Sequence, residues 1–331
     1  MHFWRAVSVI CVLPLMAQTG CSPVSRQSRQ EADTESATGS IVVRDSALRH
    51  PLRFIVYGDM RFTTTSETEL SNPGPRQALV ARIAGERPDA LFLTGDIPLH
   101  GGNEDDYREF VQETAVWRTG SLRVFPVLGN HEFQQCAEPD CLRRWWRIFP
   151  QLQGRRWYGV ALGSQLQLLA LDSNASLMPG SEQSQWLQHQ IEALGEKVRF
   201  VLILLHHPPM TDGPQGVRAN ESALATTLTA AAALSGARFV VCAAHVHNYE
   251  RFERDGIVFL VSGGGGAKPV PVQRSATDLY YGSDFPNFHY LRFELTTNEL
   301  SGEMVRLSDP DSATPGTWAV QDRFAIDARR H

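Results

Sequence analysis

Aspartate, asparagine and histidine residues gather at five places along the sequence, and their side chains are of the kinds that bind divalent metal ions. They are Asp59, Asp96, Asn130 with His131, His206 with His207, and His245 with His247. Carboxylate, amide and imidazole groups suit Zn, Mn or Fe rather than ions that prefer thiolates. Two such cations held about 3.5–4 Å apart clamp a phosphate and lower the pKa of a water between them toward neutrality. The residue types therefore point to metal-assisted hydrolysis.

Each of these groups follows a short apolar run of the kind that forms a buried strand. The runs are FIVY (54–57), ALFL (90–93), RVFPVL (123–128), FVLILL (200–205) and FVVCAA (239–244). Helical patterns lie between several of them, and strands that alternate with helices predict an α/β fold. Ligands bind at the carboxyl ends of strands in open α/β sheets. A single Asp or Asn at a strand end is explained by its preference for turns, but five strand ends that each carry Asp, Asn or His indicate a binding site.

The order GD, GD, GNHE, H-x-P and H-x-H resembles the calcineurin-like metallophosphoesterase superfamily, in particular its purple-acid-phosphatase-like branch. The likeness covers residues 52–294 and includes AAHVHNYERF, VSGGGGAKP, and LDSN before a QxxWL helix. The resemblance implies a four-layer α/β/β/α sandwich with a dinuclear site at the carboxyl ends of the strands. It also implies hydrolysis of a small phosphomonoester or phosphodiester by attack of a metal-bridging hydroxide.

The same resemblance assigns roles to individual residues. The implied ligands of the first ion are Asp59, Asp96 and His247, and those of the second ion, which shares Asp96, are Asn130, His206 and His245. His131 would be the acid that contacts the phosphate. His206 is preferred to His207 as the ligand because Pro208 follows it at the family's spacing, and His207 is the alternative.

Three positions depart from the family pattern. Arg61 stands where most of the superfamily has the histidine of D-x-H, and a guanidinium has no lone pair for a metal. Arg61 would either grip a substrate phosphate oxygen or form a structural ion pair. Leu99 replaces the iron-binding tyrosine of GDxxY, with His100 beside it as a less favoured substitute ligand, and Ala244 replaces the glycine of GHxH.

The remaining sequence predicts an exported protein of one main domain. Residues 1–21 have the form of a signal peptide, and QTGC at 18–21 resembles a lipobox that would anchor Cys21 in a membrane, with a periplasmic or outer-surface location or otherwise secretion. We expect a flexible tether over 22–49, a catalytic domain over 50–300, and a C-terminal strand and tail over 301–331. The formal net charge of -5 argues against a general nucleic-acid binder.

Two cysteines and two loops complete the expectations. Cys136 and Cys141 lie in CAEPDC, which predicts a local disulfide in an oxidising compartment. Residues 133–153 and 280–288 are expected to be loops that set specificity.

The competing functions are hydrolysis of another linkage, in a phospholipid or pyrophosphate, and a non-catalytic lipoprotein that binds metal or phosphate through a degenerate first site.

Overall fold

The computed structural model describes residues 1–2, 34–36, 38–120 and 122–328. All the elements below lie in one compact unit from Asp33 to His331. Within the described residues, no helix has the length and apolar character needed to cross a membrane. The predicted signal peptide and Cys21 fall outside the described part of the chain, so both stay predictions.

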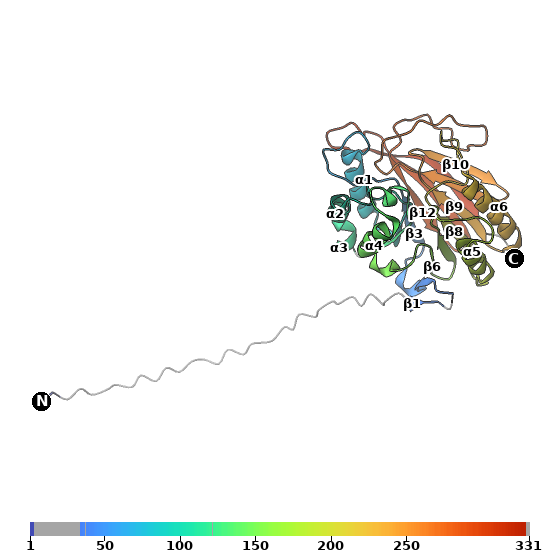
Figure 1. Ribbon diagram of the computed structural model, residues 1–331, viewed down its shortest axis with the longest axis horizontal. Coiled ribbons are helices and arrows are strands. Elements are labelled where there is room, and N and C mark those ends of the chain that lie inside the picture. The colour runs from blue at the N-terminus through green and yellow to red at the C-terminus, as the bar shows by residue number, and fades with distance from the viewer. Residues whose placement is uncertain (3–33, 37, 121, 329–331) are drawn as a thin grey trace. The chain divides into compact units, whose positions relative to one another are not determined.

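Two mixed sheets form the centre of this unit (Figure 1). The eight-stranded sheet has the order β1 (Thr34–Glu35), β2 (Ile41–Val43), β6 (Tyr158–Leu162), β7 (Leu166–Ala170), β8 (Phe200–Leu204), β9 (Arg238–Ala243), β11 (Ile257–Ser262) and β10 (Tyr249–Arg254). The six-stranded sheet has the order β14 (Trp318–Asp327), β13 (Glu299–Leu307), β12 (His289–Leu295), β3 (Leu52–Tyr57), β4 (Ala90–Leu93) and β5 (Arg123–Pro126).

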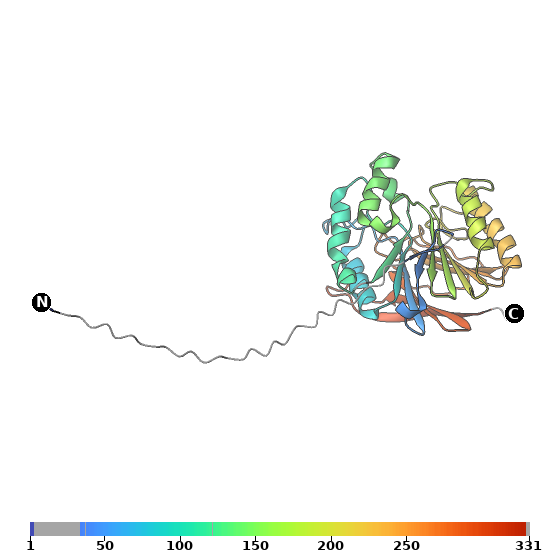
Figure 2. The same ribbon diagram turned by 90° about the horizontal axis from the view of Figure 1, so that it is seen from below.

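Helices cover the outer faces of both sheets, which gives four layers (Figures 1 and 2). On the side of the six-stranded sheet lie α1 (Pro73–Glu86), α2 (Glu104–Glu113), α3 (Ala115–Thr119) and α4 (Glu138–Ile148). On the side of the eight-stranded sheet lie α5 (Glu182–Glu192) and α6 (Ala219–Leu234). Three short 3-10 turns are η1 (Asp45–Ala47), η2 (His131–Phe133) and η3 (Pro150–Leu152). The predicted α/β/β/α sandwich is confirmed.

Strand β8 shows why the strand sequences are continuously apolar. Phe200, Leu202 and Leu204 belong to the larger hydrophobic cluster, which also contains residues of the six-stranded sheet such as Phe54. The intervening Val201 and Ile203 belong to a second cluster with residues of α5 and α6. Because successive side chains point to opposite faces and both faces are covered, every position of the strand is apolar.

The predicted domain boundaries need two corrections. Residues 22–49 are not a tether throughout, because β2 pairs in parallel with β6, with Ile41 opposite Val160. A three-residue strand between polar segments, paired with the two-residue β1 on one side and with β6 on the other, carries too little pattern to be detected. The C-terminal region predicted as one strand and a tail contains two strands of the main domain, because β13 crosses the boundary at 300 and pairs with β12 and β14 in the same sheet.

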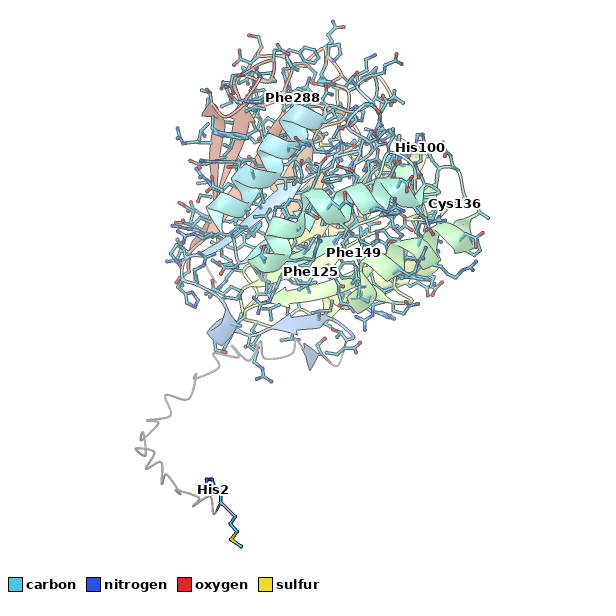
Figure 3. The ribbon with its side chains drawn as sticks, turned by 90° about the vertical axis from the view of Figure 1, so that its left-hand side faces the viewer. His2, His100, Phe125, Cys136, Phe149 and Phe288 are labelled. Carbon is cyan, nitrogen blue, oxygen red and sulfur yellow. A yellow bond between two sulfur atoms is a disulfide. The ribbon has the colours of Figure 1, made fainter. Side chains whose placement is uncertain are left out.

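The predicted loop at 133–153 contains a helix. Pro139 follows Glu138 in the first turn of α4, where a missing N–H costs nothing, so a proline there starts a helix instead of excluding one. The predicted disulfide between Cys136 and Cys141 is present, with an S–S distance of 2.03 Å. Figure 3 shows Cys136 and His100 toward one end of this helical layer, and Phe149 farther along it.

Arg76 on α1 is fully buried, and its removal should destabilise the fold strongly. Its Nε and one terminal nitrogen donate to Glu113 at 3.0 and 2.5 Å, and its other terminal nitrogen donates to Ser71 Oγ at 2.7 Å. Arg76→Ala leaves the Glu113 charge without its partner, so we expect a loss of about 3–5 kcal/mol in the free energy of unfolding, measured by urea titration. Arg108→Ala, which removes an exposed arginine from α2, should cost far less. Equal losses would contradict the prediction.

Candidate metal centre

The centre lies where strands of both sheets end. Asp59, Asp96 and Asn130 follow β3, β4 and β5 of the six-stranded sheet. His206 follows β8 of the eight-stranded sheet, and His245 and His247 follow β9 of the same sheet. The two sheets therefore contribute donors of different kinds to one site.

The backbone is constrained at three of these positions. Asp59, Asp96 and His245 have φ values of 57°, 54° and 69°, in the left-handed region that side chains other than glycine seldom adopt. Such residues cluster at functional sites, where the surrounding structure holds them. Gly129 allows the close approach of two of these turns, because a Cβ there would lie 2.3 Å from Asp96 Oδ1.

Four donor atoms converge at the position that the family resemblance implies for the second ion. His206 Nε2 lies 3.0 Å from Asn130 Oδ1 and 3.3 Å from Asp96 Oδ1. His245 Nδ1 lies 3.1 Å from Asn130 Oδ1 and 3.2 Å from His206 Nε2. Donors about 2.1 Å from one ion, at angles between octahedral and tetrahedral, are separated by about 3.0–3.4 Å. The spacing of these four atoms fits one divalent cation.

Three buried donor atoms face the position that the resemblance implies for the first ion. Asp59 Oδ1, Asp96 Oδ2 and His247 Nε2 have no hydrogen-bond partner among the described residues. One ligand atom from each of the three residues lies within 4.8 Å of the others, and His247 Nε2 is 3.7 Å from Asp59 Oδ1. Buried polar atoms without partners are rare in proteins, so three of them together fit a cation that the residues would bind.

Hydrogen bonds on the far side of two rings aim the histidine donors into the centre. His206 Nδ1 donates to Thr94 O at 2.9 Å, and His247 Nδ1 donates to Lys268 O at 2.6 Å. Each Nε2 is then left with its lone pair toward the site. Burial lowers the pKa of His247 to about 4, with the Arg61 charge adding to the shift. Neutral imidazole is the form that binds a metal.

The candidate acid, His131, lies beside the first position. Its Nδ1 bonds to Leu99 O at 2.6 Å, and its Nε2 is 3.8 Å from Asp96 Oδ2. The His131 ring contributes no atom to either group of donors, but its Nε2 faces the space between them. Burial lowers the pKa of His131, and the Asp96 charge opposes that shift.

The Arg61 side chain lies within the centre and not on the protein surface. A terminal nitrogen of its guanidinium lies 3.5 Å from Asp96 Oδ2, and only 12% of its side chain is exposed. Of the two roles expected for Arg61, an ion pair is therefore present, and its partner is the proposed bridging carboxylate.

The geometry separates His206 from the alternative ligand, His207. His207 Nδ1 lies 2.8 Å from Ser173 Oγ, and the same Oγ accepts the backbone N–H of His207 at 3.1 Å. The centroid of the His207 ring is 4.4 Å from that of His245, and one His207 nitrogen lies within 4.8 Å of a nitrogen of His206 and of His245, so His207 borders the second group of donors. His206 is the one of the two whose ring nitrogen lies among the Asn130 and Asp96 oxygens.

Glu132 has a positioning role that we had not predicted, although its motif GNHE is conspicuous. Its carboxylate accepts the backbone N–H groups of Asp96, Ile97 and Gly129 at 3.1, 2.8 and 2.7 Å. Burial raises the pKa of Glu132 to about 8, and the Asp96 charge adds to the shift. Glu132 ties the turn that carries Asp96 to the turn that carries Asn130.

Glu132→Gln should loosen these two turns. A glutamine amide turns an N–H₂ group toward at least one of the three N–H donors and leaves that donor unsatisfied. We expect a loss of about 1–3 kcal/mol in the free energy of unfolding, together with weaker metal binding. Chemical denaturation and Mn²⁺ titration measure the two effects. Glu104→Gln, on the exposed face of α2, is the control, and a similar loss there would refute the explanation.

A third acidic group, Asp212, Glu250 and Asp278, lies outside the centre. Its carboxylates already accept hydrogen bonds from the chain, including Thr211 Oγ1 to Glu250 at 2.6 Å and Ser275 N to Asp212 at 2.6 Å. The described residues therefore form a satisfied polar network at this place.

Comparison with known proteins agrees with the geometry. A curated relative, a probable purple acid phosphatase 20 of Arabidopsis thaliana, is 24% identical over 236 residues, which cover 66% of this chain and 51% of the relative. The solved purple acid phosphatase PPD1 of yellow lupin superposes with a TM-score of 0.66 at 16% identity, over 83% of this chain and 53% of that one. The chain thus spans about half the length of these two proteins.

Another solved structure with this fold is GAP50, described as the anchor in the inner membrane complex of Plasmodium. It superposes with a TM-score of 0.62 at 15% identity, over 84% of this chain and 89% of that one. At these identities the structures establish the fold alone.

The sandwich and its cluster of aspartate, asparagine and histidine residues define a metallophosphoesterase fold. The family model of calcineurin-like phosphoesterases matches residues 52–249, which is more than half of the chain. The chain belongs to the calcineurin-like phosphoesterase family.

Proposed function

We propose that this protein hydrolyses phosphomonoesters or phosphodiesters at a centre of two divalent metal ions. The observation that carries the proposal is the convergence of unpartnered Asp59, Asp96 and His247 donors beside the group formed by Asn130, His206 and His245. Asp96 belongs to both groups, since its two oxygens face opposite sides. Ions of this kind supply charge neutralisation for the phosphate and activation of a water when bound.

The chain's own residues supply the rest of the chemistry. His131 Nε2 is placed to donate a proton to the leaving oxygen, and its bond to Leu99 O holds the ring in that orientation. Arg61 Nε has no hydrogen-bond partner among the described residues, so it is free to donate to a phosphate oxygen. Mn, Zn and Fe all suit the donor set.

Metal content and turnover test the proposal together. Protein purified without added metal is subjected to elemental analysis, then treated with a chelator and reloaded with Mn²⁺ or Zn²⁺. The proposal expects hydrolysis of a chromogenic phosphomonoester or phosphodiester that disappears with the chelator and returns with the metal. A folded, metal-loaded protein without turnover on a broad panel of phosphate esters would instead favour a binding protein.

We also propose that the protein is exported and that Cys21 carries a lipid anchor. The Cys136–Cys141 disulfide supports export, because disulfides persist in oxidising compartments. Mass spectrometry of the mature N-terminus from the native host tests the anchor. An unmodified residue at a different cleavage position would disprove it.

A further inference from the structure

Arg61 makes the two halves of the centre electrostatically unequal. Its guanidinium lies 3.5 Å from Asp96 Oδ2, the oxygen on the side of Asp59 and His247. The other oxygen, Asp96 Oδ1, lies 3.3 Å from His206 Nε2. These two atoms belong to the second group of donors, which Asn130 and His245 complete. A permanent positive charge therefore lies beside the Asp96 oxygen that faces Asp59 and His247, and farther from the other Asp96 oxygen.

The backbone of Arg61 is held on both sides. Its N–H donates to Asp96 O at 2.9 Å, and its carbonyl accepts from Ser71 Oγ at 2.9 Å and from buried Arg76 at 3.1 Å. The residue has a φ of 48°, a conformation that these contacts maintain. Because the side chain is 12% exposed, water screens its charge poorly.

The two groups also differ in the number of donors. The second group presents four atoms with neighbouring separations of 3.0–3.3 Å. The first group presents three atoms, since neither Leu99 nor Arg61 offers a lone pair. Fewer donors and a nearby like charge both weaken cation binding.

We propose that the centre fills sequentially and that Arg61 sets the order. Asp96, Asn130, His206 and His245 bind a divalent ion tightly, and Asp59, Asp96 and His247 bind a second ion about tenfold or more weakly. This inference rests on the proposed function and adds which half fills first and why. Activity would then rise with free metal over the range that fills the weak half.

Titration of the metal-free full chain with Mn²⁺ tests the order, by calorimetry and by electron paramagnetic resonance. The parent should bind one tight equivalent and then a weaker one. Arg61→Gln removes the charge and should strengthen the weaker equivalent about tenfold, whereas Arg61→Lys keeps the charge and should leave it weak. Asp59→Asn should remove only the weaker equivalent. Arg53→Gln, at the other end of β3, is the matched control and should change neither.

Two equal equivalents in the parent, or an unchanged weaker equivalent in folded Arg61→Gln, would overturn the inference. Loss of the tight equivalent in Asp59→Asn would also overturn it, because the order of filling would be reversed. Equal binding leaves the phosphoesterase proposal standing. A protein that binds no Mn²⁺ in any variant contradicts that proposal itself, which keeps the two failures distinguishable.

Discussion

Asp96→Asn is expected to lower kcat/KM by about 10³-fold or more. The asparagine has nearly the same shape, so the loss reflects charge and donor capacity and not packing. Asp96 contributes oxygens to both groups of donors, and both groups should bind metal more weakly without its charge. Steady-state kinetics and elemental analysis of the same preparations measure the two effects.

The matched control for this substitution lies at the opposite end of the same strand. Asp89 precedes β4, with 7% of its side chain exposed, and it pairs with Arg49. Asp89→Asn should reduce stability and leave metal content and activity in place. If Asp96→Asn kept both metal and turnover, Asp96 would not be the bridging ligand.

His131→Gln is expected to lower kcat by about 10²–10⁴-fold on a substrate with a poor leaving group, without changing the metal content. The reason is that His131 is absent from both groups of donors while its Nε2 faces them. A weakly basic leaving oxygen departs without being protonated, so it gains little from a general acid. The loss should therefore shrink for a nitrophenyl ester and remain large for an alkyl ester.

That dependence on the leaving group separates acid catalysis from a structural role. His189→Ala, an exposed histidine on α5, is the control and should behave as the parent on both esters. Equal losses on the nitrophenyl and alkyl esters would show that His131 positions the phosphate instead of protonating the leaving oxygen. A loss of bound metal would make His131 a ligand.

The parts of the fold that were predictable are those where burial dictates composition. β8 is apolar at every position because both its faces are covered, so its sequence identifies it. β2 is only three residues long and lies between β1 and β6, and α4 has a proline in its first turn that also suits a loop. Tertiary contacts decide the structure of both segments, and these contacts cannot be read from the local sequence.

The site divides in the same way. The positions of Asp96 and His206 were predictable, because each follows a recognisable strand in a recognisable motif. The contacts of Glu132 were not, since its three partners are backbone N–H groups that meet only in the folded chain. The ion pair of Arg61 with Asp96 likewise could not be predicted, because it depends on where the guanidinium lies in the folded chain.

The division of the donors between the two sheets couples metal binding to folding. Asp59, Asp96 and Asn130 belong to one sheet and the histidines to the other, so an ion held by both joins the halves of the sandwich as a crosslink would. Anything that binds the native state alone stabilises it by RT ln(1 + [L]/Kd). A protein depleted of metal should thus unfold at a lower temperature, and cells short of the metal would lose this protein to proteolysis as well as its activity.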